Sequence, residues 1–370
     1  MSKRGASPPP GGALIKRARS GSPAPNTQIA ISSSNNERDQ GLIRTVKRTS
    51  SLEAPIISLS GSHSSEILSC RFDPTGQNIA ACSADRSVSL WRTYSPNTNY
   101  GLIQNLHKAP ILDLQWSLAS QVLYTVGADH VLNVTDLTTG QRVRKLHAHR
   151  GIINSLDRTL AGGAGVELVV TGADDGTIRV WEGGDEGPKQ PVSVYEVGCP
   201  VTSVCWSADG SSIYAGALDN EIHVIDFRKN EEVYSLMGHT DTPTSLSLSP
   251  NGNFLLSPSF SSQTIIHDVR PFSPSPNRIH RVLMGAPAGF ENTLLRGAWS
   301  KDDDGRRVGV GGADRTVCIW EVESGKVLYK LPGHKGTVTA VDFHPKEPII
   351  LTGSKDATML LGEIEPSIGV

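Results

Sequence analysis

Histidine and aspartate recur as pairs along this chain, and such a pair is the proton-moving part of many hydrolase active sites. Three of the pairs are His63 with Asp85, His149 with Asp175, and His334 with Asp356. A catalytic pair normally occurs once, whereas this one repeats, and no Gly-x-Ser-x-Gly, phosphate-loop or His-Glu-x-x-His motif accompanies it. The repetition favours an architectural role, so the sequence predicts a protein that is not an enzyme.

Cysteines are the other residues with metal or redox chemistry, and there are five: Cys70, Cys82, Cys199, Cys205 and Cys318. Their number is odd, they form no Cys-x-x-Cys motif, and most lie in apolar stretches. We therefore expect buried free thiols in a reducing compartment. We expect neither a metal site nor any other cofactor.

The 370-residue chain is long enough to bury a sizeable core, and its 37 glycines and 23 prolines suit a fold with many tight turns. No apolar run approaches the ~18–20 residues that a membrane span needs. The first residues also lack the apolar region of a secretory signal. The composition predicts no contact with a membrane.

From residue 55 the chain consists of short β-branched runs separated by Gly, Pro, Asp and Ser clusters. A phrase of small residues, Asp, Ser or Thr, and alternating apolar residues ending in Trp occurs at 82–91, 172–181 and 312–320. Weaker copies centre on Asp129, Asp219, Ser261 and Asp356. A second phrase, ending in His, precedes most copies, at 61–63, 106–107, 148–149, 238–239 and 333–334.

These phrases together resemble the WD repeat, whose period of roughly 40–45 residues corresponds to one four-stranded blade. Seven copies in register imply an all-β, seven-bladed β-propeller over residues 51–366. One blade is too small to bury both of its faces, so the blades must stack. We expect residues 1–50 to form a disordered tail and residues 367–370 a short C-terminal tail.

The resemblance implies that the repeated polar residues hold the blades together. In the family, the turn Asp bonds to the Gly-His histidine, a strand hydroxyl and the Trp indole. The expected sets are His63, Ser83, Asp85 and Trp91, and then His149, Thr171, Asp175 and Trp181. Incomplete sets contribute Asp219, Asp314, Trp320, His334 and Asp356.

Several blades depart from the repeat. Blade five has Ser261 in place of Asp and His267 in place of Trp, and blade four has 198–200 where Gly-His is expected. Blade two has Thr135, and the last blade Gly362, in place of Trp. Blade six lacks Gly-His and follows a Pro- and Arg-rich insert from Pro271 to about Glu291, which is either a binding loop or a plain surface excursion.

The ring needs a closing strand, because too few residues follow the last blade's third strand to form a fourth. The apolar segment 54–59 precedes blade one and has no blade of its own. We expect it to be the outer strand of the last blade, which joins the two ends of the propeller and removes an exposed edge.

The first 50 residues carry nine basic and two acidic side chains, a net charge of +7, and since the whole chain carries −2 the rest carries −9. Their Ser-, Pro- and Gly-rich composition predicts disorder. Two basic clusters have the spacing of a two-part nuclear import signal, and a solvated charged tail is the alternative. The clusters comprise Lys3, Arg4, Lys16, Arg17 and Arg19.

In propellers of this family the loops before the first strand and after the second lie on one face. The residues at these positions are Arg86, Lys108, His130, Arg150, Asn220, Arg315 and Lys335. Five of the seven are basic although the body is acidic. They predict an electropositive face suited to an acidic peptide or a nucleic-acid backbone, or else they are ordinary solvated rim charges.

Over roughly residues 50–366 the chain is similar to the small WD-repeat subunits of the U5 small nuclear ribonucleoprotein. The similar stretches are 51–61, 268–272, 327–334, 347–351 and 362–364. The resemblance implies a nuclear, monomeric scaffold within the spliceosome that binds spliceosomal proteins, above all the large central splicing protein. It leaves open whether small nuclear RNA is contacted.

Two other functions remain open. A substrate receptor of a cullin-type ubiquitin ligase is suggested by the blade endings 225–228 and 267–270, which resemble Trp-Asp-x-Arg but lack the Trp. The second open function is that of a hydrolase or a cofactor-binding propeller. The sequence offers no acid–base pair outside the repeat to support it.

Overall fold

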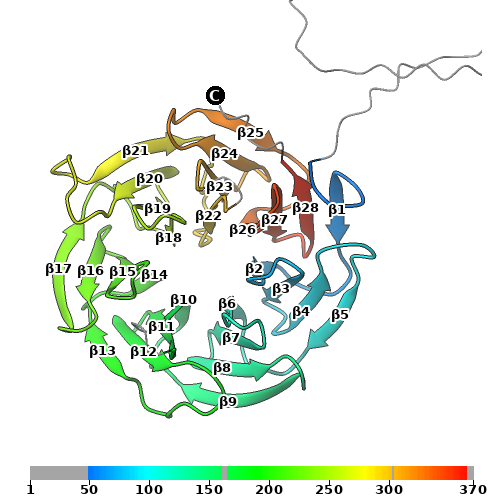
Figure 1. Cartoon of the computed structure of the whole chain (residues 1–370), viewed down its shortest axis with the longest axis horizontal. Coiled ribbons are helices and arrows are strands. Elements are labelled where there is room, and N and C mark those ends of the chain that lie inside the picture. Colours follow the sequence, from blue (N-terminus) through cyan, green and yellow to red (C-terminus); the bar gives the residue numbers. More distant parts are fainter. Residues whose placement is uncertain (1–48, 161–164, 302–303, 365–370) are drawn as a thin grey trace, which may run out of the picture. The chain divides into compact units, whose positions relative to one another are not determined.

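The computed structural model describes residues 49–160, 165–301 and 304–364, which form seven antiparallel sheets of four strands each. The sheets stand side by side in a ring (Figure 1), so the expected all-β, seven-bladed propeller is confirmed. No helix of the described residues has the length and apolarity that crossing a bilayer requires. Residues 1–48 of the predicted tail, which include the import signal, lie outside the described residues. Its last two residues, Thr49 and Ser50, donate hydrogen bonds to Glu363.

Each blade is one sheet, numbered here from the first complete blade. Blades one to three comprise β2 (Ile67–Phe72), β3 (Asn78–Ser83), β4 (Val88–Arg92), β5 (Asn99–Ile103), β6 (Ile111–Trp116), β7 (Val122–Gly127), β8 (Val131–Asp136), β9 (Gln141–His147), β10 (Ile153–Leu160), β11 (Glu167–Ala173), β12 (Thr177–Glu182) and β13 (Ser193–Glu196). Blades four and five comprise β14 (Val201–Trp206), β15 (Ser212–Ala217), β16 (Ile222–Asp226), β17 (Glu231–Leu236), β18 (Ser247–Leu248), β19 (Phe254–Pro258), β20 (Gln263–Asp268) and β21 (Ile279–Met284). Blades six and seven comprise β22 (Gly297–Trp299), β23 (Arg307–Gly311), β24 (Val317–Glu321), β25 (Val327–Leu331), β26 (Val338–Phe343), β27 (Ile349–Ser354), β28 (Met359–Glu363) and β1 (Ile56–Leu59).

The burial of a strand depends on its position within the blade. The second strands, such as β3 and β7, are buried along almost their whole length because both of their faces pack against neighbouring blades. The outer strands, such as β9 and β25, consist mostly of exposed and half-buried residues, since one of their faces meets water. The apolar core is therefore divided into clusters that lie between adjacent blades.

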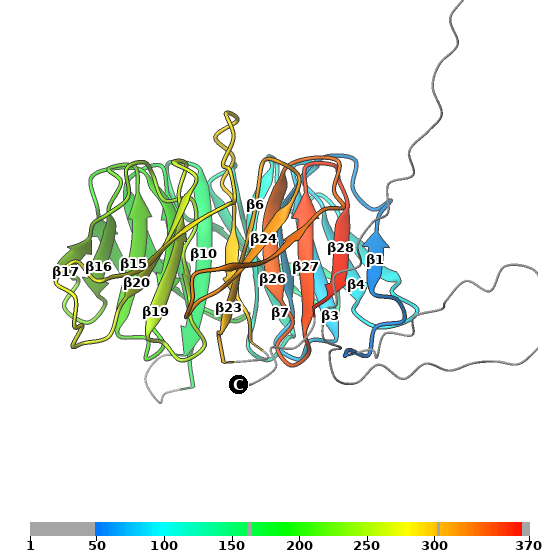
Figure 2. The same cartoon turned by 90° about the horizontal axis from the view of Figure 1, so that it is seen from above.

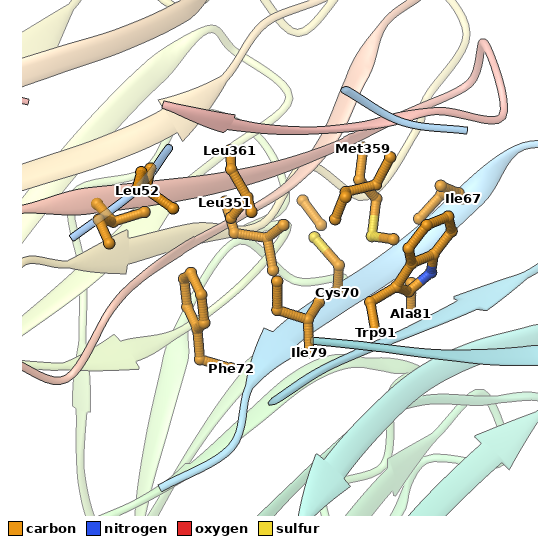
Figure 3. Close-up of a cluster of buried hydrophobic side chains, with 13 residues drawn as sticks. Leu52, Ile67, Cys70, Phe72, Ile79, Ala81, Trp91, Leu351, Met359 and Leu361 are labelled. Carbon is orange, nitrogen blue, oxygen red and sulfur yellow. The ribbon is translucent and has the colours of Figure 1, made fainter. Parts of the chain in front are cut away.

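The ring closes as the sequence predicts. β1 pairs with β28 in antiparallel register, from Ile56 opposite Gly362 to Leu59 opposite Met359. Beside this pair, side chains from blades seven and one form one buried cluster, which also takes in Leu52 (Figure 3). The two ends of the propeller are thus held by both a strand ladder and apolar packing.

The predicted insert is shorter than expected. Residues Ile279–Met284 form β21, the outer strand of blade five, so only the flanking loops 269–278 and 285–296 are irregular. The strand was missed because its exposed positions carry His and Arg, and the Pro-rich loop before it obscures its start. The second loop projects beyond the upper rim of the ring (Figure 2), and its residue Phe290 is fully exposed.

A candidate interaction face

The turn between the second and third strands is the same in all seven blades. Each turn holds one residue at a φ between 63° and 74°, the left-handed region that costs most residues about 1 kcal/mol or more. These residues are Arg86, His130, Gly176, Asn220, Ser262, Arg315 and Ala357. In blade one the turn is held by Asp85, whose carboxylate accepts hydrogen bonds from the Ser87 main-chain N–H at 2.9 Å and hydroxyl at 2.6 Å.

Blade three contains an unbroken chain of hydrogen bonds. The Trp181 indole N–H donates to the Thr171 hydroxyl at 3.0 Å, and that hydroxyl is 2.8 Å from Nε2 of His149. Nδ1 of His149 lies 3.1 Å from the Asp175 carboxylate, which also accepts the main-chain N–H of Arg150 at 2.8 Å. The network assigns the histidine proton to Nδ1, because Nε2 must accept from the hydroxyl.

The protonation states fit this network. Burial lowers the pKa of His149 to about 4, although the nearby Asp175 opposes the shift. Partial burial raises the pKa of Asp175, but hydrogen bonds from Thr177 and Arg150 outweigh it and the net pKa falls to about 2. At neutral pH a neutral imidazole therefore faces an ionised carboxylate, and both imidazole nitrogens are engaged in structural bonds.

Blade one builds the same chain with a different hydroxyl. The prediction that Ser83 supplies this hydroxyl is wrong. Nε2 of His63 lies 2.7 Å from Oγ of Ser89, which also accepts the Trp91 indole N–H at 3.0 Å. Ser83 instead donates to a main-chain carbonyl in the preceding loop. The strand position that holds threonine in blade three is Ala81 here, and Ser89 is its direct partner on the neighbouring strand.

Two further blades have a His–Asp pair but no tryptophan on the third strand. In blade two, Nδ1 of His107 lies 2.8 Å from Asp129, a pair that the sequence analysis did not include in its network. In blade seven, Nδ1 of His334 lies 3.2 Å from Asp356, and its Nε2 lies 2.8 Å from the Thr352 hydroxyl. The repeated histidine position in the loop could have identified the first of these pairs.

Blade six does not join its expected residues. Asp314 bonds to the Thr316 hydroxyl at 2.7 Å and forms an ion pair with Lys330 at 2.7 Å. The Trp320 indole N–H donates to the main-chain carbonyl of Met284 at 3.0 Å, so this tryptophan is tied to blade five and not to the aspartate. Because the loop before the blade supplies no histidine, the chain of bonds seen in blade three cannot form.

The seven residues predicted for partner binding lie on one face. Four of them are the left-handed turn residues already described, and the other three donate their main-chain N–H to the turn aspartates of their blades. These three bonds are Lys108 to Asp129 at 3.0 Å, Arg150 to Asp175 at 2.8 Å, and Lys335 to Asp356 at 2.7 Å. The network that stabilises each blade therefore also fixes the backbone of this face.

Five of the seven are exposed cations, and none of them forms an ion pair with a carboxylate of the described residues. They are Arg86, Lys108, Arg150, Arg315 and Lys335. Other lysines pair with acids near them, since Lys355 lies 3.6 Å from Glu66 and 2.7 Å from Glu291. The five cations are thus free to meet an acidic partner.

The central channel differs from this face. It contains a cavity of about 640 Å³ lined by the innermost strands. Two of its cations form ion pairs within the chain: Arg296 lies 3.0 Å from the buried Asp113, and Lys301 lies 2.9 Å from Asp342. The channel charges therefore serve to hold the blades together.

Comparison with known proteins agrees with the geometry. The family described as "WD domain, G-beta repeat" matches residues 54–92, 140–182, 189–226, 230–268 and 325–361. The chain is 38% identical to a Dictyostelium discoideum protein called U5 small nuclear ribonucleoprotein 40 kDa protein, over 92% of each chain. It is 38% identical to the pre-mRNA-splicing factor cwf17 of Schizosaccharomyces pombe over 86% of this chain and 90% of that one. The human U5 40 kDa protein is 37% identical over 86% of both. The chain therefore belongs to the WD-repeat family, and within it to the group that contains the U5 small nuclear ribonucleoprotein 40 kDa proteins.

Proposed function

We propose that this chain is a scaffold subunit of the U5 small nuclear ribonucleoprotein that acts in pre-mRNA splicing. The observation that carries the proposal is the 37–38% identity to splicing proteins across nearly the whole propeller. A shared fold alone would not carry it, because propellers serve many functions. Splicing takes place in the nucleus, so a nuclear location is part of the proposal, with the basic residues 3–19 as its import signal.

The proposal assigns no catalytic step to this chain. The His–Asp pairs, which are the residues best suited to proton transfer, are committed to bonds inside the blades. In blade three both nitrogens of His149 are bonded, and the neighbouring hydroxyl of Thr171 is shared with an indole, so it is not a free nucleophile. The protein acts by presenting surfaces to partners.

Partner binding is proposed to centre on the five unpaired cations of the candidate face. Exposed charges that form no ion pair with the described residues can meet a complementary acidic surface without first breaking an ion pair there. The partner we propose is an acidic region of the large central splicing protein. Direct contact with small nuclear RNA would use the same charges.

The test is a charge reversal of three of these cations, Arg86→Glu, Arg150→Glu and Arg315→Glu, in one tagged chain. We expect recovery of spliceosomal proteins to fall about tenfold or more, which corresponds to the loss of about 1.4 kcal/mol or more of binding free energy. The matched control reverses Arg228, Lys229 and Lys326, which lie in hairpins between third and fourth strands. Equal recovery from the two variants, at equal melting temperatures, would contradict the proposed face.

The same experiment separates protein from RNA contact. Ribonuclease treatment before elution leaves direct protein partners bound and removes those held through RNA. The ubiquitin-ligase alternative is tested alongside it, since a ligase adaptor would be recovered instead of splicing proteins. The structure gives this alternative little support. Arg270, the arginine of one of the two blade endings that suggested it, donates to Asp268 of its own blade at 2.9 Å and is therefore engaged within the chain.

A further inference from the structure

Blade four replaces the repeated His–Asp pair with a different set of polar side chains. In the loop before the blade, Val197 stands where other blades have their histidine, and Cys199 lies two residues further on, after Gly198 with its φ of 90°. The imidazole comes instead from His223, on the third strand. In blade one the corresponding strand position is Ser89, whose hydroxyl bonds to His63, so this position faces the polar pocket of its blade.

Three potential metal ligands meet in this pocket. Nε2 of His223 lies 2.9 Å from Oδ2 of Asp219, and Sγ of Cys199 lies within 4.8 Å of both atoms. Among the described residues this is the one group of three His, Cys, Asp or Glu side chains with such spacing. The His223 side chain is 11% exposed and that of Asp219 is 39% exposed, so the pocket is walled on one side and open to water on the other.

A fourth residue holds the imidazole in place. Nδ1 of His223 lies 3.0 Å from Oε1 of Glu232 on the outer strand, and the other oxygen of Glu232 accepts a bond from the Tyr195 hydroxyl at 3.4 Å. A carboxylate on the far nitrogen of a histidine is the usual support of a metal-binding imidazole, because it fixes the tautomer and directs the free nitrogen at the metal.

The ligand types select the metal. A thiolate, an imidazole nitrogen and one carboxylate oxygen suit zinc, which prefers tetrahedral sites with nitrogen and sulfur ligands. With Zn–S of about 2.3 Å and Zn–N of about 2.0 Å, neighbouring ligand atoms of a tetrahedron lie about 3.3–3.5 Å apart. The three atoms therefore reach the required positions by side-chain adjustment, with no movement of the sheet.

We propose that Cys199, Asp219 and His223 bind one zinc ion, with Glu232 as a positioning residue and a fourth position open toward the candidate interaction face. Binding displaces into solvent the thiol proton of Cys199 and the Nε2 proton that His223 shares with Asp219, so the affinity rises with pH. The open position would be filled by water in the free protein. This site differs from the expectation of no metal site, which rested on the odd number of cysteines and the absence of a Cys-x-x-Cys motif.

The test measures zinc binding by the metal-free full chain in competition with a chromophoric chelator. We expect one zinc per chain, with Cys199→Ser and Asp219→Asn each weakening affinity by about tenfold or more. The matched control is Cys318→Ser, which removes a thiol in blade six and should leave the affinity unchanged. Cobalt substitution supplies a second readout, since a thiolate-to-cobalt absorption band should appear in the full chain and disappear only in Cys199→Ser.

Glu232→Gln tests the positioning role separately. We expect weaker zinc binding, by about tenfold, with the thiolate-to-cobalt band retained at saturating metal, because the three ligands remain. The proposal is overturned if the full chain binds no stoichiometric zinc, or if Cys199→Ser binds zinc and gives the cobalt band as the unaltered chain does.

Discussion

Blades three and five occupy equivalent positions in one ring but are stabilised differently. In blade three, Trp181, Thr171, His149 and Asp175 form a continuous chain of hydrogen bonds. In blade five the corresponding chain is interrupted at both ends, because serine stands in place of the aspartate and histidine in place of the tryptophan. The blade folds into the same four-stranded sheet nonetheless, so the polar chain is an added stabilisation and the stacking of apolar faces sets the architecture.

The interruption leaves blade five with buried nitrogen atoms that lack partners. Nε2 of His239 lies 2.6 Å from the Ser257 hydroxyl, but its Nδ1 and both nitrogens of the fully buried His267 have no hydrogen-bond partner within the described residues. The two rings lie 5.7 Å apart. Burial, together with the neighbouring His239, lowers the pKa of His267 to about 3. Blade five is therefore the part of the ring where acid should act most strongly.

The largest expected effect is the loss of stability on acidification. In the unfolded chain a histidine takes up a proton below about pH 6.5, whereas folded His267 resists protonation until about pH 3. Its contribution is thus complete above pH 6.5 and falls as the pH drops, by roughly 3 kcal/mol between pH 6.5 and pH 4. Urea unfolding at pH 7 and pH 4 should show a loss that is larger by roughly 3 kcal/mol in the unaltered chain than in His267→Phe, because the other buried histidines lower the stability of both proteins in acid.

The same variant supplies its own control at neutral pH. Replacing a buried group that has unpaired nitrogens by an apolar ring of similar size should not lower stability at pH 7, because no hydrogen bond is lost. The other buried histidines, including His149 and His239, are present in both proteins and cancel in the comparison. Parallel pH profiles for the two proteins would show that His267 stays neutral in the unfolded chain or finds a partner in the folded one.

A smaller effect is expected from removing the blade-three aspartate. Asp175→Ala removes the acceptor of the Arg150 main-chain N–H and leaves Nδ1 of His149 only the Thr177 hydroxyl at 3.0 Å, which should cost about 1–3 kcal/mol of unfolding free energy. The matched change in blade five, Ser261→Ala, removes one bond to the Ser259 hydroxyl at 2.6 Å and should cost about 0.5 kcal/mol or less. Equal losses in thermal or urea unfolding would remove the distinction between the two blades.

The architecture was predictable because it is repeated. Seven copies of one phrase predict seven blades, and the unassigned apolar segment 54–59 predicts the closing strand, which the ladder from Ile56 to Leu59 confirms. Because the copies recur at a similar spacing, a blade with a weakly matching sequence can be located from the blades before and after it. The complete polar chain in blade three was predictable for the same reason, since its four residues stand at the repeat's own positions.

The contacts that the sequence did not predict depend on which residues lie opposite each other on neighbouring strands. A linear sequence pattern does not contain this register. Ser89 replaces the expected hydroxyl only because it lies directly opposite Ala81 on the next strand. His223 meets Cys199 and Asp219 because a third strand, a loop and a turn converge at one end of blade four. The strand β21 was missed because its sequence is polar on its exposed face. In each case, the decisive contact joins segments whose relation becomes visible only after the sheet is assembled.

The smallest effect is expected from a substitution that gives blade five the turn aspartate of blade three. Ser261→Asp places a carboxylate at the turn position that Asp175 occupies in blade three, where it can accept the proton on Nδ1 of His239. The gain from this bond is offset in part by burying the new charge, which leaves about 0.5–1 kcal/mol of added stability at pH 7. The pKa of His239, which burial lowers to about 4, should rise toward its ordinary value in an NMR titration, because the carboxylate favours the charged imidazole. Ser261→Asn, which has the shape without the charge, should leave that pKa near 4. If the aspartate raises neither the stability nor the pKa, the polar chain of blade three depends on its own loop geometry and cannot be restored one residue at a time.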